Sequence, residues 1–505
     1  MKKTVIILIV TMLVGNMYAQ PRLATDGNDF LLSKYFQPFI ALNVDNGSYT
    51  GLVTPLNNTK NAITKEKMNA SIIKFKKYNF DQDWFLIPTH FNAEATFDSP
   101  HNLIMLFSEY DDSSNQYTIY KELFAKKSSS YTSNPFKLGT YAIDKREGKL
   151  LYTASSSDHS KHLVLAILTN NSNRYKGLFY LIIGANGEIV SQNEINPSFK
   201  YNQFKIQGVS ISDEGDIFIA VNSFNESRKK TETENIYLLK IQNQILSSYE
   251  IETPYFTINS LSMKLLFNNN ILISGYCKEP TKGVASVFSL PFNGNKNSFG
   301  QFSNVELSKV VKDRYPNSNL NGASFSFVAI DMVELSNNKI ALIGENRAVV
   351  ESHNDKKGTT SYTYHTRNIL TTFIDLDGEI RQTSVVNKYQ ISEEYPFYNP
   401  NFYAMGVSFD YFRDEDGLYY IFNDLIDNYL SPNQTPNIYE ADHYKNSCTM
   451  AVRVADDSKL EKTMINRYDN TNEVYYKLAH NDEDTEMAVL TFVGKTNYTL
   501  RKLAY

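Results

Sequence analysis

The stretch from Gly208 to Asn222, GVSISDEGDIFIAVN, places an acidic, glycine-containing turn between two short β-rich runs. Asp213, Glu214 and Gly215 form the turn signal, and the glycine can take the positive φ that tight hairpins need. The second run, Ile217 to Val221, is continuously apolar, which is typical of a strand covered on both faces. We therefore expect a hairpin in the interior of a layered β structure.

The same layout of β run, polar turn and apolar run recurs along the chain. Its turns lie near Pro100, Ser160, Gly215, Asn269, Asn337, Asp416 and Asp484. They are about 64 residues apart on average, and a second hairpin follows most of them. Repeated units of four strands are typical of a β-propeller. The sequence thus predicts an all-β fold, a β-propeller of seven four-stranded blades, with six blades as the main alternative.

The repeated pattern of apolar run, S-D/N-x-G and apolar run resembles the blades of NHL and TolB-like propellers, most closely from Gly208 to Val221. The repeated Trp-Asp and the kelch diglycine of other propeller classes do not occur, and Trp84 is the single tryptophan. The resemblance implies a propeller fold and assigns no functional residue.

The N-terminus has the pattern of a secretory signal peptide over residues 1–19. Two lysines precede a short apolar run, Thr4 to Gly15, and Ala19 stands at the expected cleavage point. That run is too short to span a membrane, and no later run reaches the required length. We expect an exported protein without a membrane span, in the periplasm, at the cell surface or outside the cell.

The rest of the chain divides into two regions by the position of the repeats. Residues 20–70 form an N-terminal segment with one hairpin around Asp45, Asn46 and Gly47, and residues 71–505 form the propeller. Ser71 to Phe75 is a lone strand before the first unit, whereas the last unit ends after three strands at Tyr498 to Ala504. We expect these two strands to pair and close the ring.

Charge and cysteine content exclude some classes of function. The net charge is -5 over 505 residues with no basic block, so nucleic-acid binding is not expected. The two cysteines, Cys277 and Cys448, fall two units apart, which favours buried free thiols over the disulfide that an exported protein allows.

No motif points to a metal, a cofactor or catalysis. The eight histidines lack metal-ligand spacing. The acidic stretches Asp375 to Gly378 and Asp414 to Gly417 resemble the start of calcium loops but lack the later ligands, so we interpret them as hairpin turns. Carboxylates that are distant in sequence and meet in space remain an open alternative.

The candidate binding residues lie in the long connections between strands. These connections are Asn222 to Asn235, Asn304 to Ser324, Arg347 to Arg367, Asn387 to Asn401 and Asp427 to Asn446, and in a propeller they emerge on one face. Loops on a rigid scaffold often carry function. In an aromatic, proline-containing stretch, Tyr395, Phe397 and Tyr398 offer rings for a partner, and His365 beside Tyr364 could hydrogen-bond a ligand.

The leading hypothesis is an exported non-catalytic protein that binds a protein, an envelope component or a glycan through this face. The main alternative is an exported polysaccharide hydrolase or lyase with its site on the same face. A subunit of a large assembly is the third possibility. A cluster of carboxylates with shifted pKa values in the centre would favour the enzyme, whereas a broad apolar patch would favour the binding protein.

Overall fold

The computed structural model describes the backbone of the following residues: 22–24, 29–31, 36–44, 48–55, 71–76, 79–86, 92–125, 130–131, 135–143, 150–169, 175–199, 203–227, 230–252, 256–279, 285–307, 311, 325–335, 338–354, 359–392, 407–413, 417–430, 436–440, 446–457, 459–467, 473–479, 486–493 and 497–504. Side chains are described between Glu94 and Arg467. The expected signal peptide lies outside the described residues and stays a prediction.

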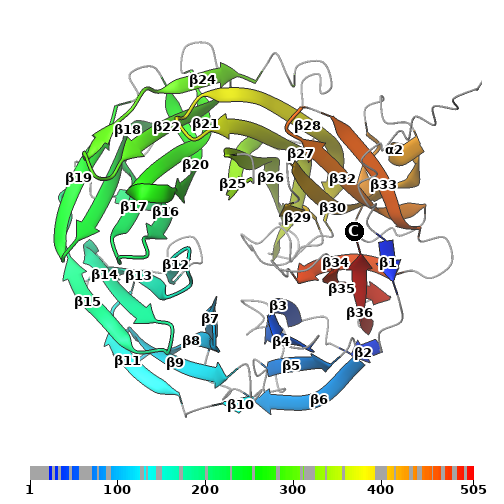
Figure 1. Cartoon of the computed structure of the whole chain (residues 1–505), viewed down its shortest axis with the longest axis horizontal. Helices are drawn as coiled ribbons and strands as arrows, with labels where there is room; N and C mark the ends of the chain where they lie inside the picture. Colours follow the sequence, from blue (N-terminus) through cyan, green and yellow to red (C-terminus); the bar gives the residue numbers. More distant parts are fainter. Residues whose placement is uncertain are drawn as a thin grey trace, which may run out of the picture.

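Within these residues the strands form eight sheets arranged in a ring, so the all-β propeller fold is confirmed (Figure 1). Sheet 1 contains β3 (Phe36–Val44), β4 (Ser48–Pro55), β5 (Ser71–Lys76) and β6 (Asn79–Leu86). Sheet 2 contains β7 (Asn92–Asp98), β8 (Asn102–Asp111), β9 (Gln116–Ala125), β10 (Ser130–Tyr131) and β11 (Phe136–Tyr141). Sheet 3 contains β12 (Tyr152–Ser155), β13 (Lys161–Thr169), β14 (Tyr175–Gly184) and β15 (Ile189–Ile195). Sheet 4 contains β16 (Gln203–Ile211), β17 (Ile217–Ser227), β18 (Lys230–Gln242) and β19 (Ile245–Ile251).

The second half of the ring repeats this plan, and its described residues also include two short helices, η2 and α2. Sheet 5 contains β20 (Thr257–Leu265), β21 (Asn270–Lys278), β22 (Ala285–Asn293), β23 (Ser298–Phe299) and β24 (Ser303–Glu306), with the short helix η2 (Phe267–Asn269) before β21. Sheet 6 contains β25 (Ser326–Glu334), β26 (Lys339–Asn354), β27 (Thr359–Asp375), β28 (Ile380–Ile391) and β31 (Tyr439–Glu440). Sheet 7 contains β29 (Asp410–Arg413), β30 (Gly417–Leu425), β32 (Ser447–Ala455) and β33 (Leu460–Arg467), with helix α2 (Ile426–Leu430) after β30. Sheet 8 contains β34 (Glu473–Ala479), β35 (Glu486–Val493), β36 (Asn497–Ala504), β1 (Arg22–Ala24) and β2 (Asp29–Leu31).

The expected count of seven blades, or six, is not confirmed by the eight sheets of the described residues. Each of the seven turn positions found in the sequence falls between the first and second strands of one sheet. The acidic stretch Asp375 to Gly378 is the hairpin turn between β27 and β28, whereas residues 414–416 lie outside the described residues. The hairpin expected around residues 45–47 was placed outside the ring; these three residues are not among those described, but β3 and β4 on either side of them pair antiparallel. β3 and β4 combine with β5 and β6 into a complete sheet of their own.

Ring closure also differs from the expectation. The predicted pairing of Ser71 to Phe75 with Tyr498 to Ala504 is wrong, because β5 already has β4 and β6 as its two neighbours. The free edge of β36 is instead covered by the N-terminal strands, with Arg22 opposite Ala504 and Asp29 opposite Thr499. The two ends of the chain therefore share sheet 8.

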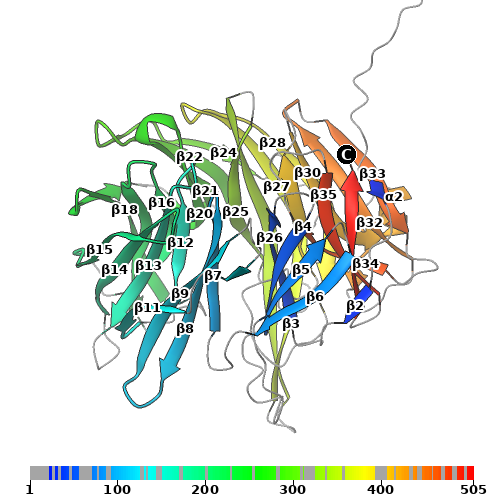
Figure 2. The same ribbon diagram turned by 60° about the horizontal axis from the view of Figure 1, so that its bottom comes forward.

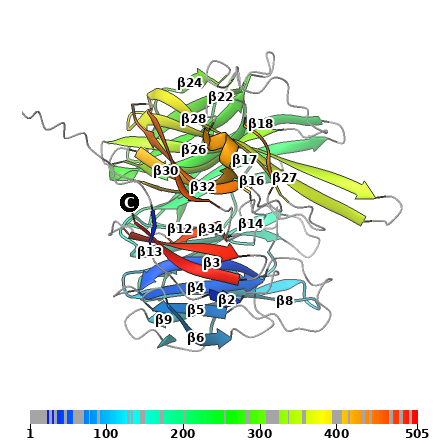
Figure 3. The ribbon, with the colours of Figure 1, turned by 90° about the vertical axis from the view of Figure 1, so that its right-hand side faces the viewer.

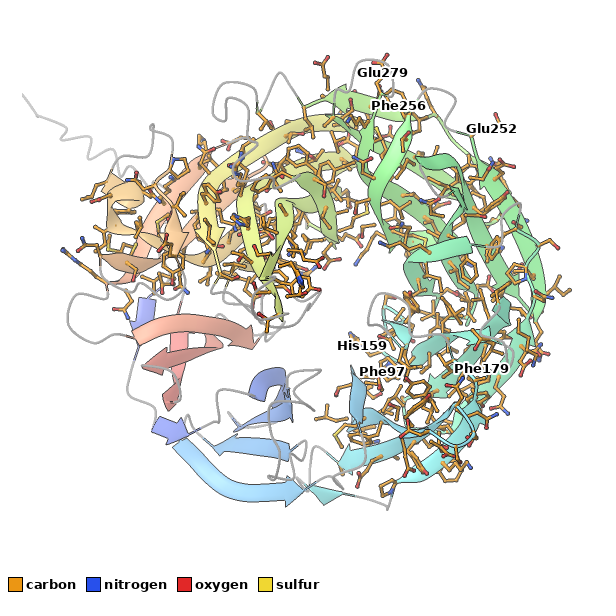
Figure 4. All side chains as sticks on the ribbon, turned by 180° about the vertical axis from the view of Figure 1, so that it is seen from behind. Phe97, His159, Phe179, Glu252, Phe256 and Glu279 are labelled. Carbon is orange, nitrogen blue, oxygen red and sulfur yellow. The ribbon has the colours of Figure 1, made fainter. Side chains whose placement is uncertain are left out.

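Sheets 2 to 7, whose side chains are described, are held together by packing between neighbouring sheets. Ile217, Ile219 and Val221 of β17 pack with sheet 3, whereas Phe218 and Ala220 pack with sheet 5. All five are at most 1% exposed, which confirms the expectation of a strand covered on both faces. Equivalent clusters join sheets 2 and 3, 5 and 6, and 6 and 7, and Figure 4 shows Phe97 and Phe179 in the first of these.

Lysine side chains add polar contacts between the turns of adjacent sheets. Lys240 of sheet 4 donates to the carbonyl oxygen of Gly294 in sheet 5 at 2.7 Å. Lys161 of sheet 3 donates to the carbonyl oxygen of Asp213, in the turn between β16 and β17. Gly215 in that turn has φ 101°, which the hairpin requires and other residues rarely adopt. The turns are thus tied from one sheet to the next.

One close inter-sheet approach gives a test of this packing. A Cβ atom at Gly344 in β26 would lie 1.9 Å from Oη of Tyr276, which is fully buried in sheet 5. We expect Gly344→Ala to destabilise the protein by about 1–3 kcal/mol, because the ring cannot move in a packed core. Gly208→Ala is the matched control, since its nearest neighbour would be the Cβ of Met263 at 3.5 Å. Chemical denaturation measures both, and equal stability of the two variants would contradict the packing.

Closure can be tested by truncation at the N-terminus. A chain that begins at residue 32 lacks β1 and β2, so the edge of β36 loses its partner strands. We expect it to melt well below a chain that begins at residue 20, with a loss of several kcal/mol. If the two chains melt together, the N-terminal strands do not close the ring.

Candidate functional site

The longest strands of the described residues form a hairpin that extends past its own sheet. β26 has 16 residues and β27 has 17. β25 pairs with β26 as far as Arg347, and β28 pairs with β27 from His365 onwards. Beyond these points residues 349–354 and 359–364 pair with each other, and we call them the arm. Figures 2 and 3 show the arm projecting from the ring.

The arm corrects the expectation of a long loop between Arg347 and Arg367. The residues there are rich in Val, Thr and Tyr, which favour strands, and those described, up to Asn354 and from Thr359, continue the ladder of β26 and β27. Residues 222–235 likewise continue β17 and β18 as a hairpin up to Ser227 and from Lys230. Both hairpins join the second and third strands of their sheets, so they lie on the same face, which we call the arm face.

A buried charged group, the base cluster, lies where the arm leaves the sheet. It consists of Glu345, Arg347, Thr366, Lys388, Gln390 and Ser408. The ammonium of Lys388 lies 2.6 Å from one carboxylate oxygen of Glu345, and the guanidinium of Arg347 lies 2.6 Å from the other. Glu345 and Lys388 are both fully buried. Two cations from β26 and β28 thus neutralise one buried carboxylate.

The remaining hydrogen bonds of the base cluster are also supplied internally. Lys388 donates to Oγ1 of Thr366 at 2.7 Å and to Oε1 of Gln390 at 2.8 Å. Ser408 donates its hydroxyl to Glu345 and its backbone N–H to Gln390, both at 2.8 Å. Ser408 has φ 108°, an unusual value for a residue with a side chain, which these two bonds maintain. The cluster therefore fixes the segment just before β29 of sheet 7 to sheet 6.

The pKa values in the base cluster follow from burial and pairing. Burial alone would raise the pKa of Glu345, but Lys388 and Arg347 outweigh it and hold that pKa below its usual value. Burial lowers the pKa of Lys388, and Glu345 opposes the change. The pair is stable as ions because each partner compensates the desolvation of the other.

The opposite face of sheet 6 carries a third cation, Arg367, in the strand position next to Thr366 of the base cluster. The guanidinium carbon of Arg367 lies 3.9 Å from the ring centre of Phe325 and 4.5 Å from that of Tyr389. The two rings thus flank a planar cation, an arrangement that arginine makes well. His365 lies beside them, with Nδ1 3.4 Å from the hydroxyl of Tyr389. Burial and then Arg367 lower the pKa of His365, which favours its neutral form.

The residues chosen from the sequence have different outcomes. His365 and Tyr364 lie in β27 and are 8% and 0% exposed, so they support the arm from the protein interior. Tyr395, Phe397 and Tyr398 lie outside the described residues, and their role in binding stays a prediction. The described residues on either side of them, Ser392 and Ser408, both lie at the base of the arm.

The base cluster was not predicted from the sequence. Its signal is a charge directly after a continuous apolar run, as Glu345 follows Ile340 to Gly344. Lys388 lacks this signal, because Asn387 separates it from Val385 and Val386. Neither position reveals its partner, because the two residues are 43 positions apart and meet only through the pairing of three strands.

Other features of the described residues bear on the class of protein. Cys277 and Cys448 are buried free thiols in sheets 5 and 7. No group of three or more His, Cys, Asp or Glu side chains in the described part of the chain could hold a metal ion. Among the same residues no helix has the length and apolar character needed to cross a membrane.

The chain matches no protein-family model and no curated protein. Similar solved structures include the β-propeller domain of the Trilobed protease from Pyrococcus furiosus, which is 11% identical with a TM-score of 0.37 and covers 86% of this chain and 97% of that domain. The polysaccharide lyase Uly1 is 9% identical with a TM-score of 0.40, over 96% of this chain and 99% of the lyase. Prolyl oligopeptidase B from Galerina marginata is 8% identical with a TM-score of 0.41, over 91% of this chain, which spans 55% of the length of that enzyme.

The buried ion pair of the base cluster can be tested by substitution. We expect Lys388→Met to destabilise the protein by about 3–5 kcal/mol, because it leaves the carboxylate of Glu345 buried without its main counter-charge. Lys176→Met is the matched control, since the pair of Lys176 and Glu194 is about half exposed and should contribute about 0–1 kcal/mol. Urea denaturation measures both changes. A small effect of Lys388→Met would contradict the structural role of the pair.

Proposed function

We propose that the protein is an exported binding protein that uses the arm face to hold a protein or an envelope component. The observation that carries this proposal is the arm itself, a two-stranded extension with a buried, charge-compensated base. Isolated hairpins are only marginally stable in water, so an arm that keeps its shape needs such a base. A rigid base with exposed residues beyond it is a suitable arrangement for recognition.

The side chains of the arm support binding to a polypeptide or an envelope surface. Glu351, Ser352 and His353 are exposed near the tip, and Val349 and Tyr362 are partly exposed along one face. This mixture of an aromatic ring, an aliphatic residue and polar groups is common at protein interfaces. The buried charges of the base cluster contact one another, so their described role is to support the arm.

The proposal can be tested by shortening the arm. We replace residues 350–363 with Asn-Gly, so that Val349 and Tyr364 are joined by a tight turn that suits a hairpin. The sheet and the base cluster are retained. We therefore expect the free energy of unfolding to change by no more than about 0.5–1 kcal/mol. Affinity capture from the native envelope, followed by mass spectrometry, should lose the partners that the unchanged protein retains.

The control for the capture experiment lies on the opposite face. Ile245 and Phe267 are 69% and 85% exposed at turns that join third to fourth and first to second strands. Replacing both with alanine should leave capture unchanged. If the control and the shortened arm lose the same partners, or neither loses any, the arm is not the binding element. Release of shorter glycans from envelope polysaccharide by the unchanged protein would favour the enzyme instead.

A further inference from the structure

A strap from sheet 7 crosses onto sheet 6 at the arm face. We use this name for the described residues 426–430 and 436–440, which follow β30 and include α2 and β31. β31 pairs in parallel with the end of β28, with Tyr439 opposite Gln390 and Glu440 opposite Ile391. The strap thus contacts the strand that carries Lys388 and Gln390 of the base cluster.

One buried carboxylate holds the strap through a chain of hydrogen bonds. Oδ1 of Asp424 accepts from the side-chain amide of Asn428 at 2.5 Å and from the N–H of Leu425 at 2.8 Å. Asn428 in α2 then holds Asn437 at both backbone groups, donating to its carbonyl oxygen at 2.9 Å and accepting from its N–H at 2.7 Å. Asp424 and Asn428 are 0% and 7% exposed. The strap is therefore fixed to β30 by two buried side chains.

The surroundings of Asp424 do not compensate a full negative charge. Its second oxygen, Oδ2, is buried and has no hydrogen-bond partner. Lys388 of β28 is near enough to affect it, but the ammonium of Lys388 already contacts Glu345, Thr366 and Gln390. An ammonium has three donors, so these contacts use them all.

Two further titratable groups face Asp424 from sheet 7. Lys462 of β33 favours the ionised carboxylate from a distance. Cys448 of β32, opposite Asp424 in the ladder, is a neutral thiol because burial raises its pKa to about 12. Burial therefore dominates at Asp424 and raises the pKa of its carboxyl to about 7, although Asn428, Leu425 and the two lysines lower it in part.

We propose that Asp424 is a proton-sensitive latch, which holds the strap when it is protonated and loosens it when it ionises. Linkage gives the direction in which the stability of the strap changes with pH. The pKa of a carboxyl exposed by opening of the strap lies near 4, below its value of about 7 when buried. The stabilisation is thus complete below pH 4 and declines as the pH rises to 7, after which it stays low. Because the strap lies on the arm face, the latch would make the local stability of that face depend on pH. This inference goes beyond the binding function proposed above.

Hydrogen–deuterium exchange of the full-length protein tests the latch without any partner. After correction for intrinsic exchange, strap amides should lose protection by about tenfold per pH unit between pH 5 and 7, and then level off. Asp424→Asn, a neutral isostere, should remove this dependence. Asp427→Asn is the matched control, because Asp427 is exposed on the same helix, and it should behave as the unchanged protein.

Three outcomes would overturn the latch. They are strap protection that does not change with pH, the same change in Asp424→Asn, and an equal change in the central residues of β30, Leu418 to Phe422. The last comparison needs only the unchanged protein, so the test remains decisive if Asp424→Asn does not fold. Loss of the latch would leave the capture result for the arm unaffected.

Discussion

The ring depends on side-chain packing between sheets, because no backbone ladder in the described residues joins one sheet to the next apart from the strap. Each middle strand must therefore present apolar residues on both faces, as Ile217 to Val221 do. This requirement produces the continuous apolar runs that the sequence shows. It also means that a sheet has little stability without its two neighbours, so covering the last edge with β1 and β2 affects the whole ring.

Two-sided burial also explains why the base cluster is unusual. A polar side chain at a middle strand faces an apolar neighbour unless the next sheet supplies a partner. Glu345 is accommodated because Arg347, Lys388 and Ser408 converge on it from two strands of sheet 6 and from the segment just before sheet 7. The ions are retained together or not at all, since removing one leaves the other buried. The polar contact thereby fixes the geometry between two sheets at the point where the arm begins.

The sequence predicted the positions of the turns and the ring-shaped fold. It did not predict the number of sheets or the strands that close the ring. A turn such as Asp213 to Gly215 is local, and its chemistry determines the hairpin wherever the sheet lies. The number of sheets and the closing strand are not local. The amino-acid sequence of β5 is compatible with pairing to β4 or to β36. Only the positions of all the other strands decide between the two partners. The base cluster could not be predicted for the same reason, because Glu345, Lys388 and Ser408 come from separate elements.

The middle strands change character along their length, which separates the stable part of the ring from the adaptable part. β17, β26 and β30 are apolar near the short turns and polar toward the arm face, where Asn222, Glu345 and Asp424 lie. Dispersion and burial are independent of pH, whereas hydrogen-bonded and ionisable groups respond to protons and ligands. A change at the arm face can therefore alter the strap or the arm without disturbing the apolar packing that keeps the ring closed. The binding function and the pH control that we propose therefore both rely on the polar ends of these strands, at the arm face.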